Sequence, residues 1–292
     1  HEIGFDTLLM YSWRDREVVM DLLALLAGNR VNYTVNVIGG VRKDVTEEEK
    51  GQILKAVDIL EERTKYYVQV ATEEVSFIER LSKVGYISYE DALRLGAVGP
   101  TGRASGIKRD VRKDDPYAAY EEIDFDVITD DHCDVYGRAV VRVKELLQSY
   151  SIIRQLIKKL PQTPLSVNVP KNIPAGEAVA RYEAPRGEDI HYVKSNGTDK
   201  PDRVKLRAPT LANVQCVAKM LENGNFADVP IVVAAIDPCF SCTDRMIVAA
   251  NDVLSEKENR MTWKQLREFS INWYKKNRGI DFSKIKKSDK HI

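Results

Sequence analysis

Residues 135–160 read VYGRAVVRVKELLQSYSIIRQLIKKL. Apolar side chains recur in this stretch at spacings of three and four, which is typical of an amphipathic helix. Pro161 follows directly and cannot continue the helix. The chain before this stretch is helical in pattern, whereas short segments of β character punctuated by prolines follow it. The sequence therefore predicts an α-rich α+β fold: a long-helix bundle followed by a small β-containing C-terminal portion.

Two further helices are expected in the first half of the chain. Residues 14–26 place apolar side chains at helical spacing, and Gly28 with Asn29 supplies a stop signal. Thr46 and Glu49 form a capping-box pattern, which opens a long helical run to about residue 74.

The second half is expected to contain short strands and one helix. Strand-like segments occupy residues 176–185 and 189–197, and Asn196-Gly197 is a hairpin turn signal. A helix is predicted for Leu211–Leu221. The short apolar run Ile231–Ile236 is of the kind expected of a buried strand.

Three parts are predicted: residues 1–160 as the helical-bundle part, 161–245 as the β-containing part with a metal-ligand motif, and 246–292 as a C-terminal extension. The extension carries 11 basic and 6 acidic side chains, a local excess of five positive charges. It is either a basic helical surface extension or a peptide removed during maturation. The chain begins at His1, without Met, and soon enters an amphipathic helix, so we expect a portion to precede it.

The composition excludes several classes of protein. Equal numbers of basic and acidic residues, 44 of each, give no net charge, which argues against a nucleic-acid binder. Hydrophobic content of 43% with 30% charged residues is ordinary for a soluble globular chain. No apolar stretch approaches the roughly 20 residues that span a bilayer. Four cysteines make no disulfide scaffold and favour a reducing compartment.

One motif has the spacing of metal ligands. Cys239 and Cys242 are separated by two residues, so a turn can bring both sulfurs to one side. The pair could be half of a zinc site, a redox pair or two buried structural thiols. A redox pair of the thioredoxin type requires a helix to begin at the motif. The pair follows the predicted strand Ile231–Ile236, and loops that leave rigid strands commonly present ligands.

Two other segments place a charged or hydroxyl side chain beside a proline after a strand-like run. These are EAPRG at residues 183–187 and KLRAPT at residues 205–210. Proline fixes φ and removes a donor, so it holds the backbone stiffly while a neighbouring side chain reaches inward. Taken singly, each segment is also compatible with a strand end that carries an exposed arginine.

Taken in order, EAPRG (183–187), KLRAPTLAN (205–213) and DPCFSCTDR (237–245) resemble three segments of the NiFe-hydrogenase large subunit. Upstream, residues 38–44 and 101–117 resemble the energy-converting, membrane-bound hydrogenases and the homologous quinone-site subunit of respiratory complex I. The resemblance extends from residue 1 to Arg245. Its CTDR ending points to the energy-converting group.

The resemblance assigns roles to the residues of the cysteine segment. Cys239 resembles the terminal nickel thiolate that can accept a proton, and Cys242 resembles the thiolate that bridges nickel and iron. Soft thiolates suit both metals. Asp237 resembles the acid that orients an arginine beside the site. Complex I relatives lack cysteines at this position, so the pair separates the two branches.

The proline-containing segments would complete the surroundings of a NiFe(CN)2CO centre. Arg186 matches an arginine held above the metals, whose guanidinium can bond an iron-bound cyanide and assist heterolytic H2 cleavage. Thr210 would donate its hydroxyl to the second cyanide. Pro185 and Pro209 would form dry walls around these diatomic ligands.

The sequence also departs from the family pattern. Family members carry a second CxxC near their N-terminus, which supplies the other two thiolates, and a nearby glutamate that relays protons. Neither is found here, and Cys133 and Cys216 have no partner cysteine three residues on. We therefore expect an N-terminally truncated chain that is inactive as an isolated fragment.

The resemblance implies an enzyme that reduces protons reversibly to H2, linked to ferredoxin or formate. Electrons would come from an iron–sulfur small subunit, because no cysteines are left here to hold a cluster. Membrane ion-translocating subunits would hold the chain at the cytoplasmic face of the cell membrane. A maturation protease would act after Arg245. The alternative is a nickel-free complex I-like or sulfur-reducing electron-transfer subunit of the same superfamily.

Overall fold

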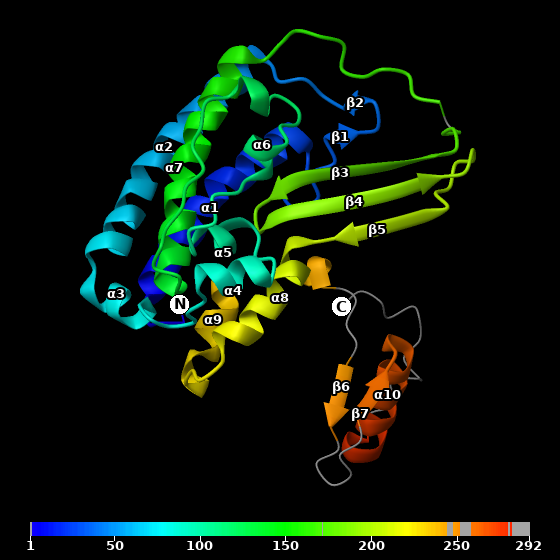
Figure 1. Ribbon diagram of the computed structural model, residues 1–292. Coiled ribbons are helices and arrows are strands. Elements are labelled where there is room, and N and C mark those ends of the chain that lie inside the picture. Colours follow the sequence, from blue (N-terminus) through cyan, green and yellow to red (C-terminus); the bar gives the residue numbers. More distant parts are fainter. Residues whose placement is uncertain (1, 171, 244–247, 252–257, 280, 282–292) are drawn as a thin grey trace. The chain divides into compact units, whose positions relative to one another are not determined.

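The computed structural model describes residues 2–170, 172–243, 248–251, 258–279 and 281. The chain divides into two compact units, His1–Cys242 and Thr243–Ile292. As predicted, the fold is α-rich α+β (Figure 1). The helices are α1 (Asp6–Ala27), α2 (Glu47–Glu73), α3 (Val75–Leu81), α4 (Tyr89–Arg94), α5 (Gly99–Arg103), α6 (Val111–Asp114), α7 (Val135–Lys159), α8 (Pro209–Met220), α9 (Val229–Ala235) and α10 (Trp263–Arg278), with 3-10 turns η1 (Tyr120–Glu122), η2 (Phe226–Asp228) and η3 (Phe240–Thr243). The strands are β1 (Asn36–Val37), β2 (Gly40–Val41), β3 (Gly176–Ala184), β4 (Gly187–Ser195), β5 (Arg203–Arg207), β6 (Val248–Asn251) and β7 (Glu258–Met261).

The long helices form the bundle that the sequence predicts. Helix α2 packs against both α1 and α7 (Figure 1). Ile53, Val57 and Leu60 lie on one face of α2 and bury against Tyr150 of α7. Each such aliphatic side chain contributes about 1.5–3 kcal/mol relative to an exposed one.

The helix ends follow local signals in the sequence. Gly28 ends α1 in the left-handed region, with φ of 69°. Thr46 and Glu49 form the expected capping box at the start of α2, where each side chain accepts the other residue's backbone N–H. Asp134 caps α7 by accepting a hydrogen bond from Gly137 N at 2.9 Å. The predicted helices are confirmed, although α1 begins at Asp6, well before residue 14.

The larger of the two sheets described in the first unit is a three-stranded antiparallel meander, β3–β4–β5, and the smaller pairs β1 with β2. Ala184 pairs with Gly187, so only Pro185 and Arg186 form the turn between β3 and β4. We call these two residues the Pro-Arg turn. Strand β4 contacts α5 and α8. The tight turn therefore presents Arg186 at the end of the sheet that meets helices.

The prediction of a buried strand at Ile231–Ile236 is wrong. These residues lie in α9 and its C-cap, and Pro230 lies in the first helical turn, where its missing N–H is not needed. Val232 and Ile236, four residues apart, are 1% and 2% exposed, whereas Ala234 is exposed. A spacing of four is the helical one, and an unbroken apolar run of this length does not distinguish the two structures.

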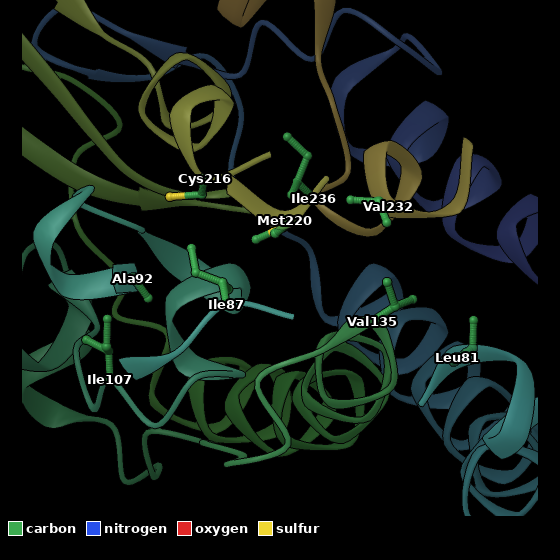
Figure 2. Close-up of a cluster of buried hydrophobic side chains, with 9 residues drawn as sticks. All are labelled: Leu81, Ile87, Ala92, Ile107, Val135, Cys216, Met220, Val232 and Ile236. Atoms are coloured by element: carbon green, nitrogen blue, oxygen red, sulfur yellow. The ribbon is translucent and has the colours of Figure 1, made fainter. Parts of the chain in front are cut away.

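Helices α8 and α9 share one apolar core with the segments around α4, α5 and the start of α7 (Figure 2). Cys216 and Met220 enter this core from α8, and Val232 and Ile236 enter it from α9. The core fixes both helices, and therefore the loops that leave them.

The second unit contains its own small sheet and a helix. Strands β6 and β7 pair antiparallel. Helix α10 begins with a capping box between Thr262 and Gln265 and ends at Gly279, whose φ is 68°.

Candidate metal centre

Cys239 and Cys242 lie on the short segment that follows α9. Cys242 N donates to Cys239 O at 3.1 Å, so the turn η3 holds the two residues together. Cys239 Sγ lies 3.0 Å from Ser241 Oγ, and both thiols are half-buried. Asp237 turns the chain out of α9 with φ of 56°, a conformation that aspartate tolerates better than most residues. The pair therefore follows a helix rather than a strand.

The two thiols differ in acidity. Hydrogen bonds from the Ser241 hydroxyl and from the Cys242 amide lower the pKa of Cys239 to about 7. Burial raises the pKa of Cys242, and its hydrogen bond with Cys239 adds to this effect. The lowered pKa increases the fraction of Cys239 that is thiolate near neutral pH, and the thiolate is the form of cysteine that binds metals and acts as a nucleophile.

Arg186 and Asp237, predicted to act together, are in direct contact. Arg186 Nε donates to Asp237 O, and Nη2 donates to Asp237 Oδ1, each at 3.0 Å. This two-point contact fixes the plane of the guanidinium. On the far side of Asp237, Arg142 Nη1 lies 3.7 Å from Oδ2, and Arg142 also donates to Ala235 O. The sequence interpretation gave Arg142 no role.

The remaining predicted site residues lie on either side of the cysteine segment. Thr210, in the first turn of α8, accepts a hydrogen bond from Cys239 N at 3.3 Å and is 1% exposed. Pro209 is buried beside it at the start of α8, and Pro185 is exposed in the Pro-Arg turn. The structure thus brings Thr210 and Arg186 to the cysteine segment from two different elements.

Asn213 was not singled out from the sequence, although it ends one of the quoted motifs. Its Oδ1 accepts from Val98 N at 3.0 Å, and its Nδ2 donates to Val98 O at 3.3 Å and to Arg186 O at 3.5 Å. Gly99, next in the chain, lies so close to the Pro-Arg turn that a Cβ there would be 2.4 Å from Arg186 O. Sequence pattern gives no signal for such a contact between distant segments.

A buried charge network supports β3 just before the Pro-Arg turn. Arg103, 2% exposed, donates to Glu183 Oε1 at 2.7 Å and to Glu145 Oε1 at 2.8 Å. Asp110 lies 3.6 Å from the same guanidinium, and the second oxygen of Glu183 accepts from Val111 N. Burial raises the pKa of Glu183. We call Arg103, Glu145, Glu183 and Asp110 the Arg103 network.

A cavity of about 430 Å³ joins this network to the site. It is lined by Arg103, Arg142, Glu145, Glu183, Pro185 and Asp237, among others. Charged groups of both signs face the cavity beneath the Pro-Arg turn, so it is suited to water and to polar groups.

The donor set for a metal consists of the two thiols. Cys216 lies in the apolar core, and Cys133 is also buried. Within the described part of the chain, no group of three or more metal-type side chains includes the cysteine pair; the one such group is Asp130, Asp131 and His132. The predicted protease site after Arg245 lies outside the described residues.

Residues 2–173 and 167–245 match the family described as the respiratory-chain NADH dehydrogenase 49 Kd subunit. The chain belongs to this family. It is 39% identical over 246 residues to the carbon monoxide-induced hydrogenase of Rhodospirillum rubrum, covering 84% of this chain and 68% of that protein. It is 38% identical over 277 residues to the membrane-bound hydrogenase subunit alpha of Pyrococcus furiosus, covering 88% and 65%.

A solved structure shares the fold. The membrane-bound sulfane sulfur reductase, an archaeal respiratory membrane complex, matches with a TM-score of 0.79 and 35% identity, covering 84% of this chain and 68% of that one. The chain spans about two thirds of the length of these relatives. The predicted homology to membrane-bound hydrogenases and to the complex I subunit is confirmed. Some of these relatives are described as subunits of membrane complexes. Among the described helices, none is both long and apolar enough to cross a membrane.

Proposed function

We propose that this chain is the catalytic large subunit of an energy-converting, membrane-bound NiFe-hydrogenase, which reduces protons reversibly to H2. The observation that carries the proposal is the half-buried pair Cys239 and Cys242 beside the two-point contact of Arg186 with Asp237. Paired thiols are a donor set for soft metals. A subunit that only binds a quinone does not need them.

The residues present fit one half of a NiFe(CN)2CO centre. Cys239 and Cys242 would supply two thiolates, and the other two would come from outside these 292 residues, because Cys133 and Cys216 are buried elsewhere. When bound, such a centre supplies the site where H2 is split heterolytically and its electrons are withdrawn.

Each neighbouring side chain has a task in this proposal. Cys239 would hold a proton at Sγ, and Arg186 would place a permanent positive charge over the site in a plane fixed by Asp237. Thr210 would turn its hydroxyl hydrogen toward a cyanide, since its oxygen already accepts from Cys239 N. Pro209, buried, and Pro185 would keep donors away from the diatomic ligands.

The partners follow from the same proposal. An iron–sulfur small subunit would deliver electrons, and membrane ion-translocating subunits would hold the complex at the cytoplasmic face of the membrane. Two relatives are described as a membrane-bound hydrogenase subunit and a respiratory membrane complex, which supports this assignment. A maturation protease acting after Arg245 would complete assembly.

The alternative is a nickel-free, complex I-like or sulfur-reducing electron-transfer subunit. The observation that favours it is the match to the sulfane sulfur reductase complex at a TM-score of 0.79. In that case the thiols would serve sulfur chemistry or structure.

Nickel content distinguishes the two candidates. We expect about one nickel ion per large subunit in the complex isolated from its native source, as measured by elemental analysis. Cys239→Ser and Cys242→Ser should each abolish nickel binding. Cys216→Ala, in the apolar core, is the matched control and should keep it. A wild-type complex with no nickel, and iron only in cluster amounts, would overturn the hydrogenase proposal in favour of the alternative.

A further inference from the structure

Helix α8 carries two buried polar side chains on the face toward the site. Thr210 and Asn213 are three residues apart, so they lie on the same side of the helix. They are 1% and 0% exposed. Thr210 contacts the backbone of Cys239, whereas Asn213 contacts the backbone of Arg186 and Val98. One helix therefore holds both halves of the candidate site.

The amide of Asn213 joins two segments that are far apart in the sequence. It accepts from Val98 N and donates to Val98 O, which fixes the start of α5 in two directions. The same Nδ2 donates to Arg186 O at 3.5 Å. A buried amide that makes all three bonds constrains the position of each segment relative to α8.

Close packing adds to these hydrogen bonds. Gly99 has φ of 63°, and a Cβ on it would lie 2.4 Å from both Arg186 O and Gly187 Cα. The Pro-Arg turn therefore rests directly on the backbone that Asn213 holds. Because this contact is close-packed, a shift of Val98 would displace Arg186 as well.

The same buried face of α8 continues into the apolar core. Cys216 and Met220 are buried there together with Val232 and Ile236 of α9 (Figure 2). Because Asp237 and Cys239 follow α9 directly, the same core fixes the partner of Arg186. Helix α8 can thus act as a rigid spacer between the two halves of the site.

We propose that Asn213 is a positioning residue, which sets the location of Arg186 relative to Cys239 by fastening the Pro-Arg turn to the helix that carries Thr210. The inference rests on the proposed function, since it assumes that Arg186 and Cys239 act together. Asn213 itself does not touch the reacting atoms.

The test compares Asn213→Ala and Asn213→Asp with Gln215→Ala, an exposed position on the same helix, in the intact complex. We expect Asn213→Ala to lower H2 production about tenfold to a hundredfold at unchanged nickel content, because small misplacements of a catalytic group are costly. The infrared bands of the iron-bound cyanides should shift. In a complex that already carries Arg186→Lys, adding Asn213→Ala should lower H2 production only slightly further. A purely structural role for Asn213 would instead give the same additional loss in both backgrounds.

Hydrogen exchange provides a readout that does not need the metal. In Asn213→Ala, exchange should speed up at Val98 while the rest of the first unit stays protected. Asn213→Asp keeps the acceptor for Val98 N but loses the donors, so Val98 should stay protected while H2 production falls. This variant also serves if the alanine variant does not accumulate. Gln215→Ala should change neither quantity.

Three results with Asn213→Ala would overturn the inference: unchanged exchange at Val98, exchange that rises throughout the unit, or an equal loss of activity in both Arg186 backgrounds. If the wild-type complex holds no nickel, the proposed function fails on its own. Local exchange in the Asn213 variants would then still support or refute the fastening of the turn.

Discussion

The contact between Arg186 and Asp237 depends on the shape of the guanidinium. Its Nε and Nη2 reach two different oxygens of Asp237, one on the backbone and one on the side chain. A lysine ammonium carries the same charge but cannot make this planar two-point contact. The orientation of the charge, and not only its sign, is therefore under the control of a single residue.

Arg186→Lys tests the importance of this orientation. We expect H2 production by the complex to fall about a hundredfold, because a preorganised charge loses its fixed direction. Thermal stability should change little, since the Arg186 side chain is about one-third exposed. Arg181→Lys, which alters a surface arginine on the same hairpin, is the control and should keep its activity. Equal losses in the two variants would contradict a specific role for Arg186.

The Arg103 network makes a different prediction, which concerns stability. Arg103→Met leaves Glu183 buried without its charged partner, whereas Asp110 keeps its contact with Arg112. Breaking a buried pair in this way costs about 3–5 kcal/mol. Urea unfolding of the complex subunit measures the loss. Arg109→Met, at an exposed pair with Asp114, should cost under about 1 kcal/mol. A similar, small cost in both variants would show that the network does not stabilise the fold.

The pH dependence of that loss has a definite sign. Burial raises the pKa of Glu183, so the folded chain binds its proton more readily than the unfolded chain does. Lowering the pH therefore favours the folded state at this residue. Without Arg103, the ionised form of Glu183 is still less favoured in the folded chain. The loss in free energy of unfolding caused by Arg103→Met should therefore become smaller as the pH falls toward the ordinary glutamate range. A deficit that grows on acidification would contradict this account of Glu183.

At the scale of elements, local signals predicted most of the secondary structure. The capping box at Thr46 and Glu49 and the glycine at 28 depend only on neighbouring residues, and they mark the ends of α2 and α1 correctly. Helix α9 was predicted wrongly as a strand, because its unbroken apolar run carries no period. The apolar core that decides between helix and strand is formed by residues distant in the sequence.

Two glycine substitutions probe how the elements pack. Gly99→Ala should destabilise the chain by about 1–3 kcal/mol, because its Cβ would collide with Arg186 O and Gly187 Cα. It should also lower H2 production by displacing the Pro-Arg turn. Gly51 lies on the exposed face of α2, where an added Cβ would meet no neighbouring side chain or segment within 4 Å. Gly51→Ala should therefore raise the free energy of unfolding by about 0.5–1 kcal/mol. Calorimetry measures the stability of both variants, and activity assays measure their H2 production. A Gly99→Ala variant with unchanged stability and activity would contradict the close packing of α5 on the Pro-Arg turn.

At the scale of the whole molecule, the candidate site is assembled from segments that local patterns cannot join. The resemblance to hydrogenases predicted roles for Arg186, Thr210 and the cysteines, because their motifs are specific. It assigned no role to Arg103 or Asn213, although both lie in segments that carry the resemblance, because their contacts span more than 25 residues of sequence. A buried charge or amide carries no periodic signature, so only the folded chain reveals it.

The two units of the chain lead to a prediction about maturation. All three apolar core clusters found in the described residues lie between residues 1 and 242, so the first unit has its own cores without the extension. If the proposed protease acts after Arg245, the large subunit of a nickel-containing complex should lack residues 246–292, as intact-mass spectrometry would detect. Cys239→Ser, which should not load nickel, should retain them. A nickel-containing complex with the extension still attached would contradict the maturation step, whereas a full-length chain in a nickel-free complex would agree with the sulfur-reducing alternative.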